Sequence, residues 1–364
     1  MLKHLYLYQV KKVDYIIVGL GIGGLAFAKT LQDQNRSFVV FDKKNPGATV
    51  ASGGVLNPTV LKRFTAAWNS EFFIAKAYPF YKSLEKVVNE NVLFNTSIRR
   101  ILANIEEQNN WMVASDKAIL SRFLSSEILT NHNLAIQAPF GFGVVQEAKT
   151  IDPASLLNSF KEFLRVNHQF VQEDFKHEAL KVNQSGVQYK DLLASKIVFA
   201  EGAGVASNPY FNLSISPERE KVFVGNKGEY IIIKAPALKS KAILKGPVMI
   251  IPLGGDLYKV GASYGRDDFS SNITAQAREE ISEKVKKMIS CKFEVVNQVT
   301  GIRPTVKDRK PLIGCLQDSK TISFLNGLGT RGLTMAPLLA EHLFEYLEND
   351  KTLPEAINIK RFLN

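Results

Sequence analysis

Two patterns of apolar residues alternate in the first part of the chain, and their order predicts a fold class. A short β-branched run at 15–18 predicts a strand that is buried on both faces. Apolar residues at helical spacing over 25–31 predict a helix packed on that strand, and a second apolar run at 37–41 predicts the next strand. Strand, helix and strand in this order are typical of a Rossmann-like βαβ core, so we expect an α/β protein.

Later segments extend this pattern into a second region. Residues 228–234, 247–252 and 258–261 alternate between apolar and polar positions, which predicts a mostly antiparallel sheet. Apolar runs at 196–200 and 321–325 predict strands that return to the first sheet from distant parts of the chain. The other expected elements are an irregular segment over 46–58, a helix over 71–89 broken or bent at Pro79, strands within 91–111, a helix over 116–129, a strand over 140–145, a helix started by Asp152 and Pro153, a helix over 274–290, and a last helix with Pro337 in its first turn.

The turn after the first strand has the spacing Gly19-x-Gly21-x-x-Gly24, in which each glycine has its own physical reason. Gly19 permits the tight turn, Gly21 lets the backbone approach a pyrophosphate, and Gly24 lets the helix pack closely on the strand. Free N–H groups at the helix start, together with the helix dipole, would bind the phosphates. We interpret the turn as a dinucleotide site because of its context, and an ordinary βαβ turn is the alternative.

An acidic residue lies where such a site needs one. Asp42 ends the second strand, 18 residues after Gly24, and its carboxylate would accept hydrogen bonds from an adenosine ribose. Its negative charge argues against a ribose 2′-phosphate, although Lys43 and Lys44 weaken that exclusion. An incidental aspartate is again the alternative.

Composition describes an ordinary globular protein and narrows the chemistry. The 364 residues, 45% apolar and 22% charged, are enough for two packed domains. Cys291 and Cys315 lie far apart and the five histidines show no ligand spacing, so we expect no disulfide framework, no metal site and a cytoplasmic location. No apolar run approaches the roughly 20 residues that a transmembrane helix needs, and Met1–Val10 lacks the features of a signal peptide.

The formal net charge of +11 is the unusual global value. The basic residues are dispersed in pairs, which is more typical of a solvated surface than of a nucleic-acid footprint. The charge remains compatible with an RNA or another anionic substrate. The sequence does not indicate an oligomeric state.

A second glycine-rich loop follows the strand predicted at 321–325. Residues 326–334 lead from this loop into the last helix, which repeats the strand, loop and helix order of the first turn. The positive end of that helix could therefore point at a second polar region of the same ligand.

Five segments together form a longer signature. They are 18–24, Asp42, 51–58, 301–308 with 311–314, and 327–337. In content and order they resemble the D-amino-acid oxidase superfamily of FAD-dependent oxidoreductases. Within it, they look most like glycine oxidases and the flavin domain of the bifunctional enzymes that make methylaminomethyl-thiouridine in tRNA. The set spans nearly the whole chain, so it is far more specific than its first member.

The resemblance implies a two-domain α/β fold in which a Rossmann-like domain binds FAD and a discontinuous substrate domain carries the antiparallel sheet. The implied ranges are 1–80, 145–215 and 300–364 for the FAD-binding domain, and 81–144 and 216–299 for the substrate domain. The implied cofactor-binding residues are Gly19, Gly21, Ile22, Gly23, Gly24, Asp42, Lys43, Ser52, Gly53, Gly54, Gly202, Ala203, Gly329, Thr330, Arg331, Gly332 and Leu333.

The chain also departs from the family pattern. Glu201 stands where the family usually has a small or uncharged residue. Gly301 stands where sarcosine oxidases place a flavin-linking cysteine, which is why we expect FAD to be held without a covalent bond. No methyltransferase domain accompanies these 364 residues, which weighs against a role on tRNA.

The resemblance implies oxidation of the C–N bond of a small amine or amino acid, by hydride transfer to FAD and hydrolysis of the imine. Arg303 matches the arginine that grips the substrate carboxylate in amino-acid oxidases, and a structural arginine paired with Asp308 is the alternative. Arg331 would help to stabilise negative charge on the reduced flavin. Tyr264 and Tyr230 are candidate lid or pocket residues, with ordinary packing as the alternative.

Two other functions stay open. Removal of the carboxymethyl group from carboxymethylaminomethyluridine of tRNA would use the same chemistry, and the basic surface and residues 330–332 favour it. A flavin-binding protein without turnover is the alternative of another class. The intact loops expected to face the flavin, together with Arg303, argue against that last function.

Overall fold

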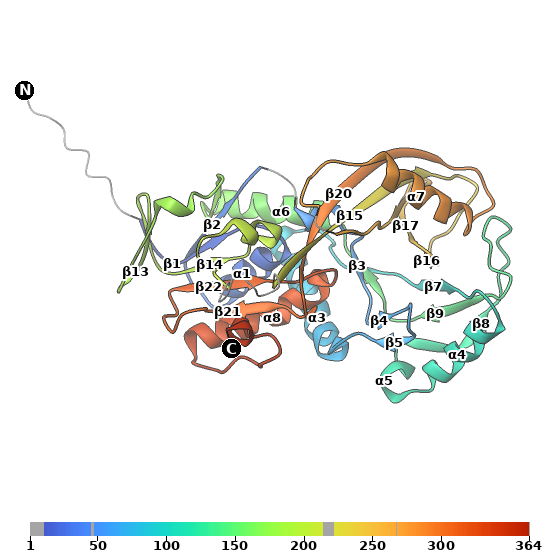
Figure 1. Cartoon of the computed structure of the whole chain (residues 1–364), viewed down its shortest axis with the longest axis horizontal. Helices are drawn as coiled ribbons and strands as arrows, with labels where there is room; N and C mark the ends of the chain where they lie inside the picture. Colours follow the sequence, from blue (N-terminus) through green and yellow to red (C-terminus); the bar gives the residue numbers. More distant parts are fainter. Residues whose placement is uncertain (1–10, 45–46, 214–221, 267, 364) are drawn as a thin grey trace, which may run out of the picture.

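The structure is a computed structural model that describes residues 11–44, 47–213, 222–266 and 268–363. The expectation for residues 1–10 and the domain boundary at 215/216 fall outside this part of the chain. Two large sheets, each with its own helices, lie side by side along the long axis of the molecule (Figure 1).

The first sheet has eight strands in the described part of the chain, and its centre is parallel, as the βαβ pattern predicts. β1 (Lys11–Val18) lies between β2 (Phe38–Asp42) and β14 (Leu192–Phe199), in parallel with both. β22 (Ile322–Asn326) pairs in parallel with β14, so the sheet is assembled from distant segments, as expected. The other strands are β11 (Phe170–Gln172), β12 (Leu180–Asn183), β13 (Gly186–Tyr189) and β21 (Leu312–Gly314).

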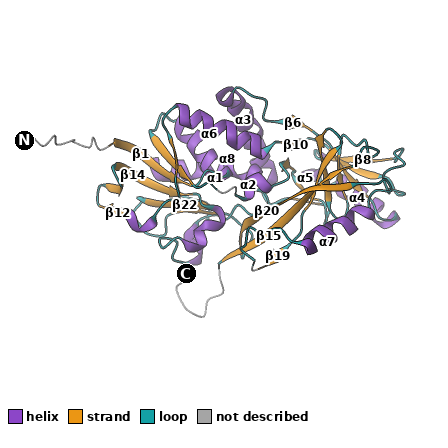
Figure 2. Cartoon of the chain, turned by 90° about the horizontal axis from the view of Figure 1, so that it is seen from above, coloured by secondary structure: helices purple, strands orange, loops and turns teal. Residues whose placement is uncertain are grey.

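Alternation along β1 divides its side chains between two hydrophobic cores. Tyr15 and Ile17 pack with helices on one face, whereas Ile16 and Val18 join a separate cluster on the other face together with Phe199. The helices of the first core gather over this sheet in Figure 2. They are α1 (Ile22–Asp33), α3 (Ser70–Val88), α6 (Pro153–Val166) and α8 (Gly332–Glu348). This packing brings the carboxyl ends of the parallel strands and the starts of α1 and α8 to one edge of the sheet.

The second sheet has nine strands in the described ranges and is mostly antiparallel, as expected. Its longest pair, β15 (Phe223–Lys234) and β20 (Glu294–Val306), stays paired from Phe223↔Val306 to Lys234↔Glu294. Next to β15 follow β18 (Leu257–Gly261), β17 (Met249–Gly254) and β16 (Ile243–Lys245) in that order. The remaining strands are β7 (Ile98–Ile101), β8 (Leu124–Leu129), β9 (Phe142–Val145) and β19 (Gly265–Arg266), and the helices packed on the sheet are α4 (Ile105–Ser115), α5 (Ala118–Ser121) and α7 (Ala275–Lys286).

Short elements complete the described chain. They are α2 (Ala48–Ala51), β3 (Val55–Leu56), β4 (Thr59–Val60), β5 (Thr65–Ala66), β6 (Phe94–Asn95), β10 (Lys149–Thr150) and the 3₁₀ turns η1 (His177–Ala179), η2 (Gly202–Ser207) and η3 (Ile359–Phe362). The expectation of a wholly irregular segment over 46–58 is therefore wrong, because α2 and β3 lie within it.

Two further local expectations are wrong. Of the range 91–111 expected to form strands, residues 105–111 belong to helix α4, because the Asn104 side chain caps the helix by accepting a hydrogen bond from the Glu107 N–H. Residues 116–129 form α5 and then β8 rather than one helix, because β8 pairs with β9 at the edge of the second sheet.

The two prolines within helices test two further details. α3 continues on both sides of Pro79, so the helix is not broken there, and a bend at this proline stays a prediction. Pro337 is the sixth residue of α8 and therefore lies in its second turn rather than its first.

The residue ranges of the two sheets suggest a refined domain division. The first sheet draws on 11–42, 170–199 and 312–326, and the second draws on 98–145 and 223–306. Since β20 crosses the expected boundary at 299/300, we propose that the whole of this strand belongs to the substrate domain.

Three further observations concern the chemistry that the chain supports. Cys291 and Cys315 are free thiols. Within the described ranges, no three His, Cys, Asp or Glu side chains gather as a metal-binding group would. None of the described helices combines the length and apolar character that a membrane span requires.

Candidate active site

A cavity of about 770 Å³ lies where the two sheets meet. Its walls come from the loops after β1, β2, β14 and β22 of the first sheet, and from β15, β17, β18 and β20 of the second. Of the expected site residues, all of which the structure describes, Gly24 alone does not line it. Those that do are Gly19, Gly21, Ile22, Gly23, Asp42, Lys43, Ser52, Gly53, Gly54, Gly202, Ala203, Tyr264, Arg303, Gly329, Thr330, Arg331, Gly332 and Leu333.

The glycines of the first turn are needed for different spatial reasons. Gly19 has φ +98°, and a Cβ there would lie 2.6 Å from the Ala200 carbonyl oxygen. A Cβ on Gly24 would lie 1.9 Å from the Gly19 carbonyl oxygen, so this position serves the close packing of α1 on β1. At Gly21 the nearest atom to an added Cβ, the Thr49 Oγ1, lies 3.5 Å away. The protein itself therefore leaves room at Gly21, as expected where a ligand approaches the backbone.

The start of α1 presents backbone donors to the cavity. Gly21 is the N-cap, and no side chain caps the helix. Ile22 N–H donates to Thr49 Oγ1 at 3.1 Å, whereas the N–H groups of Gly21 and Gly23 have no acceptor among the described residues. These free donors coincide with the positive end of the helix dipole, a combination that suits a phosphate group.

Asp42 closes the same end of the cavity. One carboxylate oxygen, Oδ1, accepts a hydrogen bond of 3.0 Å from Leu20 N–H, which fixes the side chain against the glycine turn. Burial raises the pKa of Asp42, while Lys161 and Lys43 act in the opposite direction. A carboxylate has about four acceptor positions, so Asp42 keeps capacity for hydroxyl groups of a ligand.

Two hydroxyl groups in the cavity wall lack protein partners. Ser52 Oγ and Thr300 Oγ1 are buried without a hydrogen-bond partner among the described residues, and both residues line the cavity. Buried polar atoms are normally paired, so these two hydroxyls leave hydrogen-bonding capacity for water or for a polar ligand next to them. Beside Ser52, a Cβ on Gly53 would lie 2.5 Å from Ile251 Cδ1, so the end of the isoleucine side chain would have to shift.

Arg303 enters the cavity from β20 with neutral partners. Its Nη1 donates to Asn226 Oδ1 at 2.8 Å and to the Lys227 carbonyl at 3.3 Å, and both Nη atoms approach the Ser263 carbonyl. Its expected alternative role as a partner of Asp308 is wrong, because Asp308 pairs with Arg361 at 2.8 Å. The guanidinium is thus positioned by groups that do not compensate its charge.

Tyr264 covers Arg303 from the outside. The Arg303 Cζ lies 4.6 Å from the centroid of the Tyr264 ring, a cation–π contact, and the tyrosine is 72% exposed. A ring that is exposed on one side and packed on an arginine on the other can act as a cover for the cavity. Ordinary core packing, the alternative for Tyr264, does not describe this position.

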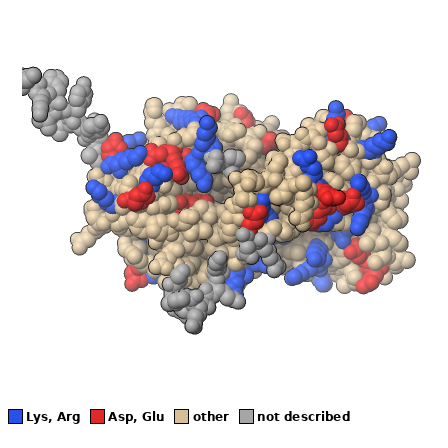
Figure 3. Space-filling view, turned by 45° about the horizontal axis from the view of Figure 1, so that its top comes forward, with Lys and Arg blue, Asp and Glu red and all other residues tan. Residues whose placement is uncertain are grey.

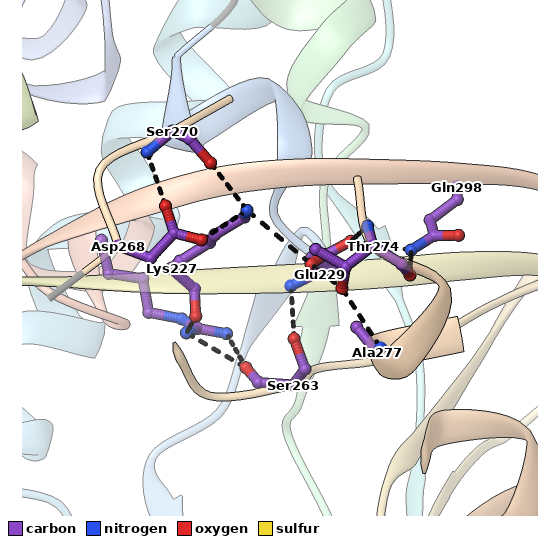
Figure 4. Close-up of polar contacts among 9 residues, drawn as sticks. Lys227, Glu229, Ser263, Asp268, Ser270, Thr274, Ala277 and Gln298 are labelled. Carbon is purple, nitrogen blue, oxygen red and sulfur yellow. Dashed lines mark hydrogen bonds and ion pairs between the residues drawn. The ribbon is translucent and has the colours of Figure 1, made fainter. Parts of the chain in front are cut away.

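A polar network secures the segment that carries Tyr264 (Figure 4). The Lys227 ammonium lies 2.7 Å from an Asp268 carboxylate oxygen and 3.0 Å from Ser270 Oγ. Glu229 accepts hydrogen bonds from the N–H and hydroxyl of Thr274, both at 2.8 Å. The hydrogen bond from Lys227 lowers the pKa of Asp268 to about 2, so this anchor is ionised at neutral pH.

Arg331 is the N-cap residue of α8 and lines the opposite wall. Its guanidinium donates to the carbonyls of Asn57 and Thr59 at 2.9 and 3.0 Å. Burial lowers the pKa of Arg331. Through these bonds Arg331 ties the segment after Ser52 to the start of α8, so two cavity walls are held together.

Glu201, the position that departs from the family pattern, has partners of its own. Its carboxylate lies 2.9 Å from His177 Nε2 and accepts a 2.6 Å hydrogen bond from Asn208. The hydrogen bond to Glu201 raises the pKa of His177. The carboxylate therefore braces the η2 turn, which lines the cavity at Gly202 and Ala203.

A comparison with protein families matches residues 14–346 to the DAO family, described as FAD-dependent oxidoreductases. The chain belongs to the DAO family of FAD-dependent oxidoreductases. The resemblance drawn from the sequence and the expected fold class are thereby confirmed.

Individual relatives are distant. Glycine oxidase of Bacillus subtilis (strain 168) is 23% identical over 356 residues, covering 92% of this chain and 93% of that protein. The tRNA 5-methylaminomethyl-2-thiouridine biosynthesis bifunctional protein MnmC of Idiomarina loihiensis is 26% identical over 209 residues, which is 54% of this chain and 32% of that protein. The chain thus spans about a third of this bifunctional relative. The crystal structure of glycine oxidase from Geobacillus kaustophilus shares the fold, with a TM-score of 0.75, 17% identity, and 97% and 98% of the two chains covered.

The cavity of this DAO-family oxidoreductase fits FAD. The N–H groups at the start of α1 suit the pyrophosphate, and Asp42 suits the adenosine ribose. The unpaired hydroxyls of Ser52 and Thr300 offer polar partners farther along the cavity.

Sequence reasoning missed several residues that build this site. Thr49, Asn226, Thr300 and Lys161 are not part of any recognisable motif, although each lines the cavity or supports a residue that does. Gly228 did leave a signal, because a glycine inside a strand often marks a close approach. A Cβ there would lie 2.1 Å from Arg303 Nη2.

Proposed function

We propose that this FAD-dependent oxidoreductase oxidises the C–N bond of an amine that lies next to a carboxylate, and that Arg303 binds the carboxylate. The observation that carries the proposal is the uncompensated guanidinium in the cavity wall. Its hydrogen-bond partners among the described residues are an amide oxygen, backbone carbonyls and the Tyr230 hydroxyl, all of them neutral. A planar guanidinium can bind a carboxylate through two parallel hydrogen bonds, which orients the substrate as well as holding it.

The residues of the cavity then determine how the reaction proceeds. Bound FAD supplies the hydride acceptor for such an oxidation. The substrate loses a hydride from the carbon next to nitrogen and a proton from the nitrogen, and water hydrolyses the resulting imine to a carbonyl compound and an amine. Arg303 fixes the reacting carbon by its carboxylate, and Tyr264 over Arg303 limits the access of water. Arg331 and the start of α8 supply positive potential from the opposite wall.

We further propose that FAD is bound without a covalent link. A Cβ at Gly301 would lie 2.9 Å from Ala51 Cβ and 3.0 Å from Ala48 Cα, so this position leaves no room for a cysteine. Neither Cys291 nor Cys315 is among the residues that line the cavity. Acid precipitation of the purified protein should therefore release its yellow colour into the supernatant, and colour that stays with the pellet would contradict the proposal.

The main experiment is anaerobic bleaching of the FAD-loaded protein by a panel of amines. Glycine, sarcosine, proline and several D-amino acids test free substrates, and the same amines without a carboxylate test the role of Arg303. Bleaching by carboxylated amines alone supports the proposal. Equal bleaching by amines with and without a carboxylate would contradict the role of Arg303. A flavin that no amine reduces would support a binding protein without turnover.

The net charge of +11 favours a second candidate, the same oxidation on carboxymethylaminomethyluridine of tRNA. Lys and Arg side chains are interspersed with Asp and Glu on the face seen in Figure 3, so that face supports no single continuous basic surface. Salt separates the two candidates, because RNA binding weakens steeply with ionic strength whereas turnover of a free amino acid changes little. A reducing cytoplasm is proposed for both on the basis of the two free thiols.

A further inference from the structure

The cavity wall extends across the second sheet to Lys245, which no sequence motif marks. Lys245 ends β16, and its side chain lines the cavity together with Pro247, Met249 and Ile251. These three neighbours are apolar. The lysine is therefore an isolated charge at the end of an apolar stretch of wall.

Strand register places Lys245 on the same face of the sheet as Arg303. The paired positions that connect the two strands are, in order, Lys245, Met249, Gly261, Tyr230 and Val299. Val299 lies on β20, four residues before Arg303. Paired residues on neighbouring strands share a face, as do residues an even number apart on one strand. Both cations thus project toward the cavity that both line.

Lys245 has no acidic partner among the described residues. Its ammonium donates a 2.7 Å hydrogen bond to the Gly246 carbonyl, and the charged groups that act on it are the cations Arg100, Lys284 and Lys62. Burial, followed by these cations, lowers the pKa of Lys245 to about 8, so most of it is still protonated at neutral pH. Arg100 and Lys284 each pair with a glutamate of their own, and Lys245 does not.

A second lysine on the same face, Lys259, differs from Lys245 because it already contacts another segment of the protein. Burial also lowers the pKa of Lys259 to about 8. Its ammonium, however, donates a 2.6 Å hydrogen bond to the Ser52 carbonyl across the sheet boundary and lies 5.3 Å from the centroid of the Tyr230 ring. Lys259 thus ties two segments of the wall together, whereas the hydrogen bond of Lys245 reaches only the carbonyl of the next residue, Gly246.

We propose that the substrate carries a second anionic group on an arm that lies along β17, and that Lys245 binds this group. The inference rests on the proposed function, since that function assigns the first carboxylate to Arg303. The two cations come from strands four steps apart in the sheet, a distance on the order of 20 Å between backbones at the usual strand spacing. Even after both side chains reach inward, the substrate is longer than glycine. The group itself is a carboxylate or a phosphate, the anions that a lysine ammonium binds.

The first test compares N-substituted glycines whose arms end in a carboxylate, a phosphonate or a neutral amide. Each is used to bleach the FAD-loaded protein anaerobically over a series of arm lengths. At one preferred length, we expect an anionic arm to lower the half-saturating concentration by about 10-fold or more relative to the amide. The better of the two anions identifies the group. Lys245→Met should remove this advantage and leave the amide series unchanged.

Lys241→Met is the matched control. Lys241 is exposed, precedes β16 and does not line the cavity, so this variant removes the same charge from the surface. It should keep the preference for anionic arms. A loss of preference in both variants would mean that net charge rather than Lys245 is responsible, and it would overturn the inference.

A binding measurement separates this inference from the proposed function. Linear dicarboxylates and monocarboxylates of equal length are titrated into the FAD-loaded protein, and binding is followed by the change in flavin absorbance. If the dicarboxylate binds more tightly than the monocarboxylate, and Lys245→Met abolishes this difference, the second anion site is supported. This holds even if no amine is oxidised, a result that would contradict the proposed function but not the second anion site. Equal binding of the dicarboxylate and the monocarboxylate would overturn the inference. It would also be overturned if the N-substituted glycines were oxidised at the same rate whether their arm is anionic or neutral.

Discussion

The two ends of the cavity expose different kinds of chemical group. At the proposed nucleotide end, the surface is backbone: glycines and the N–H groups at the start of α1, with Asp42 as the main polar side chain. At the substrate end, the surface consists of side chains carried by a sheet, with Arg303 and Lys245 at its limits. Binding at the first end should therefore depend on positions that carry no side chain, whereas binding at the second end should depend on where charged side chains lie. Substitutions should separate these two kinds of dependence.

The largest effect is expected at the nucleotide end from Gly24→Ala. The added Cβ would lie 1.9 Å from the Gly19 carbonyl oxygen, a backbone atom, so α1 must move away from β1. We expect a loss of about 3 kcal/mol in the free energy of unfolding. Where the strain is relieved by moving the turn, FAD binding should weaken by about 100-fold, the equivalent of the same energy. Denaturant unfolding and FAD titration of the apoprotein measure the two quantities.

The control for this variant is Gly265→Ala, because a Cβ there meets its nearest atom, Lys227 Cβ, at an ordinary 3.5 Å. It should change neither quantity by more than about 0.5 kcal/mol. Equal behaviour of the two variants would mean that the space around Gly24 does not matter.

At the substrate end, Arg303→Lys should raise the KM for a carboxylated amine by about 10-fold or more, since lysine cannot offer a planar pair of donors. FAD binding should stay within about twofold of the original, which is the contrast with Gly24→Ala. Steady-state kinetics and FAD titration provide the two readings. Asp308→Asn is the matched control, because Asp308 pairs with Arg361 and not with Arg303. An unchanged KM in the lysine variant would discard the assignment.

A smaller effect is expected from Gly228→Ala, which adds no charge and removes none. Its Cβ would lie 2.1 Å from Arg303 Nη2 and 2.3 Å from Cζ, so the guanidinium must shift. Because the far end of a long side chain can move, we expect the KM to rise by about threefold to tenfold with FAD binding unaffected. Combined with Arg303→Lys, the second substitution should add little, since both act on one group. Fully additive effects would contradict the contact.

The smallest effect concerns pH and the brace behind the η2 turn. The hydrogen bond to Glu201 raises the pKa of His177, so the protonated form is favoured in the folded state. This contribution to stability is complete below the ordinary histidine pKa of about 6.5 and is lost as pH rises through the raised value. His177→Gln should flatten the stability of the protein against pH in that window, by less than about 1 kcal/mol because the pair is partly exposed. Thermal unfolding at closely spaced pH values measures it, and parallel curves for both proteins would refute the brace.

The contrast between the two ends also explains what could be predicted from the sequence. The nucleotide end has local signals, because the glycine spacing over 19–24 and Asp42 lie within one βαβ unit. Arg303 was found through the family resemblance, and its partner Asn226 lies 77 residues away, where no local pattern points to it. Gly228 and Lys245 acquire their meaning only through strand pairing. The errors at 105–111 and 116–129 have a related cause, since a cap and an edge pairing decided those structures.

The central parallel strands have a consequence for the order of assembly. A Cβ at Gly23, at the start of α1, would lie 3.3 Å from the Leu325 carbonyl oxygen at the end of β22. The floor of the proposed nucleotide pocket is therefore shared by residues that lie far apart in the sequence. A nascent chain that has produced only α1 carries the glycine turn but not the completed pocket, so flavin uptake has to wait until β22 has been made.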